Sequence, residues 1–172
     1  MTIAIWFGLN YDAIKKQIIP NATKEETAAA TTHINDPNRL EAKSIGLVGR
    51  IIYPDTEEKL EKLLDNGINH MPESAVPGDN KNVVLTAHSS SLKAGPYQDI
   101  FSNINKLAIG DEISYFKDDV VYKYRVTEGK VISKTDLDFL NNLKNQNSLT
   151  LVTCWPIGTD LQRYVVVAKR VE

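Results

Sequence analysis

The sequence predicts a mainly β, single-domain protein, built as a barrel and decorated by short helices. Its apolar runs are short and rich in β-branched residues, as strands are, and turn residues separate them; the clearest are residues 83–87, 149–153 and 165–167. The chain has 172 residues, enough for one domain with a substantial core and too few for two. No internal repeat, low-complexity tract or linker divides it.

Residues 1–40 are predicted to form a helical appendage outside the barrel core, because the apolar faces of its two helices are thin. The first helix is expected over residues 11–19, where isoleucines fall on one face and Pro20 ends the pattern. The second is expected over residues 24–31, where Thr23 opens a capping box. Residues after it, up to Arg39, are predicted to be loop.

Residues 41–172 are predicted to form the barrel domain. Its first strand is expected over residues 45–53, although Gly46 and Gly49 weaken the pattern. A helix capped by Asp55 is expected next, with leucines facing inward.

A long loop is predicted over residues 70–82, and loops of this length in compact domains usually carry function. A buried strand over residues 83–87 follows it and delivers His88 into a run of serines. A short helix is expected near residues 100–107, and a hairpin over residues 113–126.

The last part of the chain is predicted to contain three further strands and a short helix. A strand over residues 130–133 is followed by a helix over residues 135–143. Residues 149–153 form the next strand, which Trp155 and Pro156 stop because proline cannot donate to a ladder. Arg163 opens the final strand, whose valines are apolar on both faces and are therefore expected to be buried on both.

Composition excludes several classes of protein. The formal net charge of -2 argues against a nucleic-acid partner, for which a basic stripe is expected. One cysteine excludes an internal disulfide, and scattered histidines beside a single thiol give no metal site, so no metal or cofactor is expected. Residues 1–9 are apolar but too short for a spanning helix and lack the basic start of a signal peptide.

Three residues at predicted strand ends are candidates for chemistry: His88, Cys154 and Arg163. Taken singly, each has an ordinary structural interpretation, as a surface histidine, a buried thiol or a salt-bridging cation at the barrel rim. Taken together, they offer a nucleophile, a proton carrier and a permanently charged donor for a developing oxyanion. A cation beside the cysteine in a hairpin also favours the thiolate form.

These residues lie in motifs that resemble those of the sortases, bacterial cysteine transpeptidases. Residues 150–154 read Thr-Leu-Val-Thr-Cys, followed by a turn, an arginine and an apolar strand; residues 82–88 read Asn-Val-Val-Leu-Thr-Ala-His. The resemblance runs from about residue 45 to the end, and is closest to classes C, D and E. Two features depart from the family pattern: its usual Ile-Pro-Lys-Ile strand is not recognisable near residues 45–53, and Ala87 replaces a common glycine.

The resemblance implies a sortase-type barrel of about eight strands and a reaction that cleaves a sorting motif of the LPxTG kind. Cys154 would form the thioacyl enzyme, His88 would carry protons, and Arg163 would hold the substrate backbone and oxyanion. Thr153, Ala87 and Trp155 are the candidate substrate-binding residues. The partners implied are a secreted protein with a sorting signal and an amine from a peptidoglycan precursor or pilin lysine.

The family also implies action on the extracellular face of the bacterial cytoplasmic membrane, and a monomer is expected. Asp36, Pro37 and Asn38 resemble the start of a lid found in pilus-type members, but lack its aromatic residue, so they form a candidate lid that is not expected to plug the site tightly. Two alternatives stay open: a catalytically silent binding module at the cell surface, since fold alone does not give function, and a cysteine hydrolase of another family. In papain-like and amidase-like hydrolases the cysteine opens a helix and precedes its histidine, which is the reverse of the order in this chain.

Overall fold

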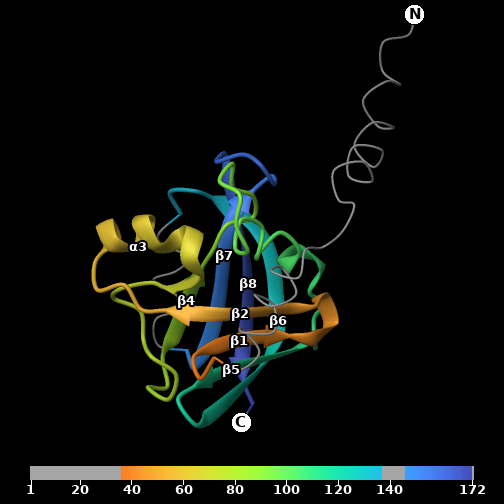
Figure 1. Cartoon of the computed structure of the whole chain (residues 1–172). Coiled ribbons are helices and arrows are strands. Elements are labelled where there is room, and N and C mark those ends of the chain that lie inside the picture. Colours follow the sequence, from red (N-terminus) through yellow and green to blue (C-terminus); the bar gives the residue numbers. More distant parts are fainter. Residues whose placement is uncertain (1–35, 137–145, 172) are drawn as a thin grey trace, which may run out of the picture.

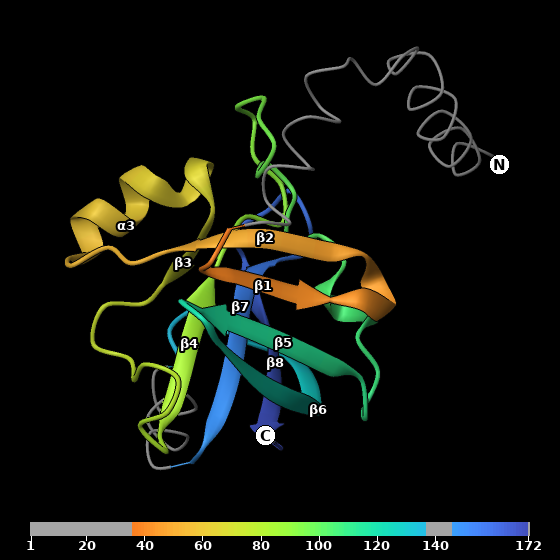
Figure 2. The same ribbon diagram turned by 60° about the horizontal axis from the view of Figure 1, so that its bottom comes forward.

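The computed structural model describes residues 36–136 and 146–171, and within them eight strands close into one barrel (Figure 1, Figure 2). The strand order around it is β1-β2-β3-β4-β7-β8-β6-β5. The helices predicted over residues 11–19 and 24–31 lie outside the described residues, as does most of the one predicted over residues 135–143. The mainly β barrel predicted from the sequence is confirmed.

The strands differ widely in length, and short helical turns connect some of them. The strands are β1 (Arg39–Ala42), β2 (Leu47–Ile52), β3 (Ile68–His70), β4 (Asn82–Thr86), β5 (Glu112–Lys117), β6 (Val120–Ser133), β7 (Ser148–Trp155) and β8 (Gln162–Arg170). The helical elements are η1 (Lys43–Ile45), α3 (Glu57–Leu63), η2 (Leu64–Asn66) and η3 (Ile104–Lys106), and α3 lies on the outside of the barrel (Figure 1). In the part of the chain described here, none of the helices has the length and apolarity needed to cross a bilayer.

Two pairs of neighbouring strands are parallel and the other pairs are antiparallel. β2 runs parallel to β3, and β4 runs parallel to β7. Parallel neighbours require a crossover connection, which α3 and η2 supply between β2 and β3. The crossover between β4 and β7 contains β5 and β6. β4 and β7 are therefore far apart in the chain, although they lie side by side in the barrel (Figure 2).

The barrel interior is filled by one large apolar cluster, to which alternate residues of each strand contribute. β4 and β7 contribute Val83, Leu85, Leu149 and Leu151, all at most 1% exposed. A second, smaller cluster lies on the opposite face of these strands and consists of Val84, Ile132, Val152 and Val165 with Met71 against it. Burial on both faces, expected for the valines of β8, is therefore confirmed.

The sequence predicts no strand for β1 or β3, and the predicted loops overlap these strands only at Arg39 and His70. β1 is the four-residue segment Arg-Leu-Glu-Ala, whose charged residues pair with each other at 2.7 Å from Arg39 Nε to Glu41 Oε1. β3 has three residues, all buried between β2 and β4. Neither segment is long enough to show a period of two, so both depend on pairing with neighbours and not on local sequence.

Three further predictions need correction. β6 is a single strand of 14 residues, where separate strands over residues 120–126 and 130–133 were expected; a bulge after Val126 interrupts the pattern without ending the strand. Thr56, not Asp55, caps α3 by accepting a hydrogen bond from the Lys59 amide at 3.3 Å. Only one helical turn, η3, forms in the expected helix near residues 100–107.

Gly49 belongs to β2 despite its weak strand propensity, because the barrel needs a residue without a side chain there. A Cβ atom on Gly49 would lie 2.9 Å from Cδ1 of Ile68 and 3.3 Å from Cγ1 of Ile100. Gly46 fulfils another requirement: its φ of +68° closes the turn between η1 and β2. The strand predicted over residues 45–53 is therefore present as Leu47–Ile52.

A buried polar group at the start of β4 fixes its register against β7. Oδ1 of Asn82 accepts hydrogen bonds of 2.9 Å from the hydroxyls of Ser148 and Thr150, and all three residues are at most 5% exposed. We expect Asn82→Ala to lower the free energy of unfolding by about 1–3 kcal/mol, because the Thr150 hydroxyl loses its acceptor in a buried site. Urea denaturation measures this, with Lys81→Ala at the exposed neighbouring position as control; equal stability of both variants would contradict it.

Candidate active site

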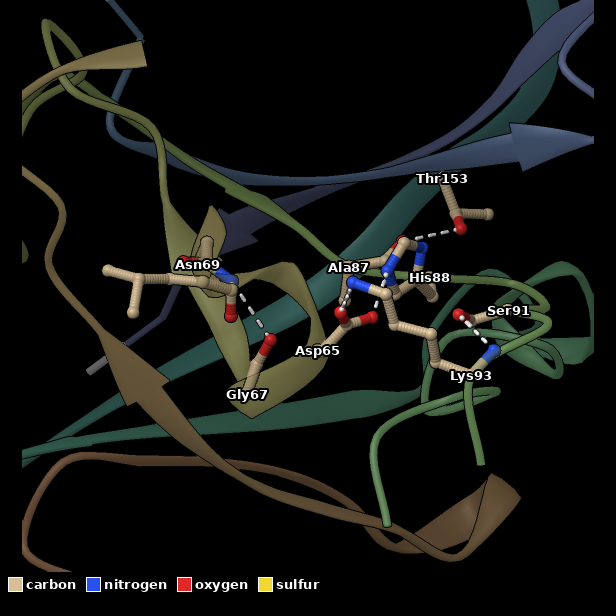
Figure 3. Close-up of polar contacts among 9 residues, drawn as sticks. Asp65, Gly67, Asn69, Ala87, His88, Ser91, Lys93 and Thr153 are labelled. Carbon is tan, nitrogen blue, oxygen red and sulfur yellow. Dashed lines mark hydrogen bonds and ion pairs between the residues drawn. The ribbon is translucent and has the colours of Figure 1, made fainter. Parts of the chain in front are cut away.

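The parallel pairing of β4 and β7 brings His88 next to Cys154. The register pairs Thr86 with Val152, so two residues further on the same register places His88 opposite Cys154. Contacts beyond the last pair maintain this alignment: the Ala87 amide donates to the Val152 carbonyl at 3.4 Å, and the Ala87 carbonyl accepts a hydrogen bond of 2.7 Å from the Thr153 hydroxyl (Figure 3).

Arg163 lies beside the same cysteine from the other side, because β7 and β8 pair Cys154 directly with Arg163. Side chains alternate between the two faces of a strand. Cys154 lies on the same face of β7 as Val152, and Arg163 on the same face of β8 as Val165. Both valines belong to the second, smaller cluster on the outside of the barrel, called the outer cluster from here on. His88 continues the alternation of Val84, which is in the outer cluster too. The three predicted residues therefore share the outer face of the barrel, at one end of three neighbouring strands.

The Cys154 thiol is half-buried and free. Burial is the main cause that raises its pKa above the ordinary value. The Arg163 charge acts in the opposite direction and lowers the pKa, while the charge and hydrogen bond of Asp160 raise it. The thiol form is therefore favoured at neutral pH, and the attacking thiolate needs a proton acceptor nearby.

Arg163 is engaged by an acidic residue that sequence reasoning missed. Its Nη1 atom lies 2.7 Å from Oδ1 of Asp160 and also donates to the Gln162 carbonyl at 3.0 Å. The hydrogen bond and charge of Arg163, followed by those of Lys134, lower the pKa of the Asp160 carboxyl. Asp160 lies in the turn between β7 and β8, three residues before Arg163.

His88 has an acidic partner as well, because the Asp65 carboxylate lies between the His88 ring and the Lys93 side chain (Figure 3). Nε2 of His88 lies 3.2 Å from Oδ1 of Asp65, and Nζ of Lys93 lies 2.6 Å from Oδ2 of the same carboxylate. The hydrogen bond from Lys93 is the largest cause that lowers the pKa of Asp65. Asp65 is 23 residues from His88 in the chain, so no local motif in the sequence indicates the pair.

The remaining predicted residues are distributed around this cluster. Thr153 is 3% exposed, and its hydroxyl donates a hydrogen bond to the Ala87 carbonyl. This bond connects β7 to the segment that follows β4. The Trp155 ring packs on Tyr164, with centroids 5.4 Å apart. These observations leave the substrate-binding role of Thr153, Ala87 and Trp155 as a prediction.

The candidate lid residues contact the neighbouring β1–β2 region. The Asp36 carboxylate accepts from the Asn38 amide at 2.9 Å, and the Asn38 carbonyl accepts from the Ile51 amide at 2.7 Å. Within residues 36–136 and 146–171 no group of three or more His, Cys, Asp or Glu side chains is arranged to hold a metal ion.

A family model described as the sortase domain matches residues 40–171 of this chain. The chain belongs to the sortase family. Sortase D of Bacillus subtilis (strain 168) is 25% identical over 111 residues, which cover 63% of this chain and 52% of that protein. This match therefore spans about half the length of the Bacillus protein. The family expected from the motifs is confirmed.

Solved sortase structures share the fold. Sortase C1 of Streptococcus agalactiae matches with a TM-score of 0.66 and 26% identity, over 78% of this chain and 67% of that chain. The sortase D5 transpeptidase of Clostridium perfringens matches with a TM-score of 0.63 and 27% identity, over 94% of this chain and 95% of that chain. Classes A, C, D and E all occur among the matched structures, including the three classes expected from the motifs.

Proposed function

We propose that this sortase is a cysteine transpeptidase that cleaves a sorting motif of the LPxTG kind between threonine and glycine. The observation that supports this most strongly is the common position of His88, Cys154 and Arg163 on the outer face, at the ends of three adjacent strands. A nucleophile, a proton carrier and a fixed cation on one rigid edge are what acyl transfer requires.

In the proposed first step, Sγ of Cys154 attacks the threonine carbonyl carbon. A C–S bond forms, the C–N bond to glycine breaks, and His88 passes the thiol proton to the departing amine. Arg163 holds the substrate carbonyl and the negative charge that develops on its oxygen. An amine then attacks the thioester and gives its proton to His88. The C–S bond breaks, His88 returns the proton to the sulfur, and the new amide leaves.

The partners we propose are a secreted protein that carries the sorting signal and an amine acceptor, either a peptidoglycan precursor or a pilin lysine. We place the reaction on the extracellular face of the bacterial cytoplasmic membrane. We propose a helical appendage before β1 and a catalytic domain from β1 onward, because the predicted boundary between residues 40 and 41 would divide β1 (Arg39–Ala42), a strand of the barrel. Residues 36–38 are proposed as a lid segment that does not plug the thiol. Thr153, Ala87 and Trp155 are proposed to border the bound peptide.

Mass spectrometry of the protein after incubation with sorting-motif peptides tests the proposed function. We expect a mass increase equal to the acyl part of the peptide on Cys154, which is discharged when an amine such as a glycine peptide is added. A silent binding module would show no adduct with any peptide of a panel. A hydrolase would cleave the peptide but form no amide product with the added amine.

Asp65 is proposed to orient the His88 ring through their 3.2 Å contact. We expect Asp65→Asn to lower kcat roughly tenfold with little change in KM, because the amide loses the charge but keeps its size. The loss stays below the ~10²–10⁴ that a general acid–base contributes, since Asp65 is partly solvated. Glu61→Gln on exposed α3 removes one negative charge elsewhere and is the control. An unchanged kcat in Asp65→Asn would show that Asp65 does not contribute to the reaction.

A further inference from the structure

The carboxylate of Asp160 contacts two of the three proposed catalytic residues at once. Its Oδ1 atom lies 2.7 Å from Nη1 of Arg163 and 3.7 Å from Sγ of Cys154. Its other oxygen, Oδ2, lies 3.4 Å from Nζ of Lys134, which directly follows β6. One acidic side chain therefore bridges the thiol, the guanidinium and a lysine.

Nη1 of Arg163 already contacts the Asp160 carboxylate and donates to the Gln162 carbonyl. A carbonyl oxygen that binds to Nη1 of Arg163 must compete with Oδ1 of Asp160 for the same donor. The two cannot share it at full strength, because a charged carboxylate is the stronger acceptor. Substrate binding and the Asp160–Arg163 contact therefore oppose each other.

The contact is also built to open easily. The Asp160 side chain is 65% exposed, and ion pairs with this much solvent around them contribute little to stability. The turn that carries it is held independently, since both the amide and the hydroxyl of Thr159 donate to the Pro156 carbonyl, at 3.0 and 2.8 Å. Release of Arg163 therefore needs a rotation of the Asp160 side chain and no change in the turn.

The charges around Cys154 predict the direction in which Asp160 shifts the balance between thiol and thiolate. Arg163 pairs with Cys154 from β8, and Asp160 contacts its sulfur from the turn, with Lys134 on the other carboxylate oxygen. The strand register places His88 opposite Cys154 at the end of β4, and Asp65 and Lys93 lie behind the histidine. Among them, Asp160 is the acid within contact distance of the sulfur. The pKa of Cys154 is raised by burial first and by Asp160 in addition, while Arg163 lowers it. Removal of the Asp160 charge therefore favours the thiolate.

We propose that Asp160 is a positioning residue that holds Arg163 and restrains the Cys154 thiol in the free protein, and that the carbonyl of a bound acyl substrate displaces it. This inference rests on the proposed function for the role of the substrate, but its first half concerns the free protein alone. Asp160 thus couples the reactivity of the thiol to the occupancy of the site. A bound acyl substrate favours the release of Arg163, so reactions of the thiol without substrate are slowed.

The test is the rate of alkylation of Cys154 by iodoacetamide as a function of pH. Cys154 is the only cysteine of the chain, so the rate reports this thiol alone. We expect Asp160→Asn to move the profile to lower pH and to raise the rate at neutral pH about fivefold, the effect of one charge near 4 Å in a water-like medium. Asp160→Glu should restore the profile toward the original. Asp119→Asn, in the exposed β5–β6 turn, removes an equal charge and is the control.

The second measurement uses the sorting-peptide reaction. We expect Asp160→Asn to lower KM several-fold while kcat is kept, because the carbonyl no longer competes for Arg163. An alkylation profile of Asp160→Asn that coincides with that of the unmodified protein overturns the proposal, and so does an unchanged KM. If no thioacyl adduct forms with any peptide, the proposed function fails, whereas the alkylation profile still decides whether Asp160 restrains the thiol.

Discussion

Cys154→Ala is expected to abolish transpeptidation completely while the barrel remains folded. The covalent step has no substitute for the sulfur, since the half-buried thiol is the single cysteine of the chain. The methyl group of alanine fits the space of the thiol, and the neighbouring Ala87–Thr153 hydrogen bond does not involve the side chain of residue 154. The measurement is product formation by chromatography, together with the melting temperature.

Two observations would contradict this expectation. Peptide cleavage that persists in homogeneous Cys154→Ala protein would show that another group performs the chemistry. A Cys154→Ala variant that does not fold would contradict the expected stability. In that case Cys154→Ser, which keeps the shape of the side chain, tests the chemistry. It is expected to lose activity by several orders of magnitude, because an alcohol is far less acidic than a thiol.

Arg163→Lys is expected to lower turnover by about 10²–10³, with an almost unchanged melting temperature. Lysine keeps the charge and can still pair with Asp160, but it lacks the planar fork that holds a carbonyl at two points. Removal of one oxyanion donor has a cost of this size in other acyl-transfer enzymes. A purely structural role at the barrel rim predicts a nearly neutral substitution, since exposed ion pairs are worth ~0–1 kcal/mol.

Arg125→Lys on the exposed face of β6 is the matched control, because it makes the same chemical change in a strand of the same barrel. Wild-type turnover in Arg163→Lys, or a loss of turnover that follows a lowered melting temperature, would move Arg163 from the catalytic residues to the structural ones.

The strands that present the three residues could be predicted because their signals are local. β4, β7 and β8 contain apolar, β-branched runs that are buried on both faces, and His88, Cys154 and Arg163 lie near one end of each. β1 and β3 could not be predicted, because strands of four and three residues are defined by their neighbours and not by a period of their own.

The acidic residues of the site escaped prediction for a related reason. Asp65 is the middle residue of a helical turn and Asp160 belongs to a turn, and aspartate in such places is ordinary. Their importance comes from contacts made across the fold, between η2 and the end of β4 in one case and between a side chain and two strands in the other. A strand end next to a titratable residue indicates a site, but it does not indicate which acid will face it.

The parallel pairing of β4 with β7 also has a consequence for how the chain acquires activity during folding. The contact between Thr153 and Ala87 joins residues 66 positions apart, and the chain between them contains β5 and β6. Closing so long a loop carries a large entropic cost that only the completed barrel offsets, and such non-local pairings form slowly. A chain in which β4 and β7 have not yet paired therefore holds its thiol apart from its imidazole, and the reactive centre forms only when these two strands pair.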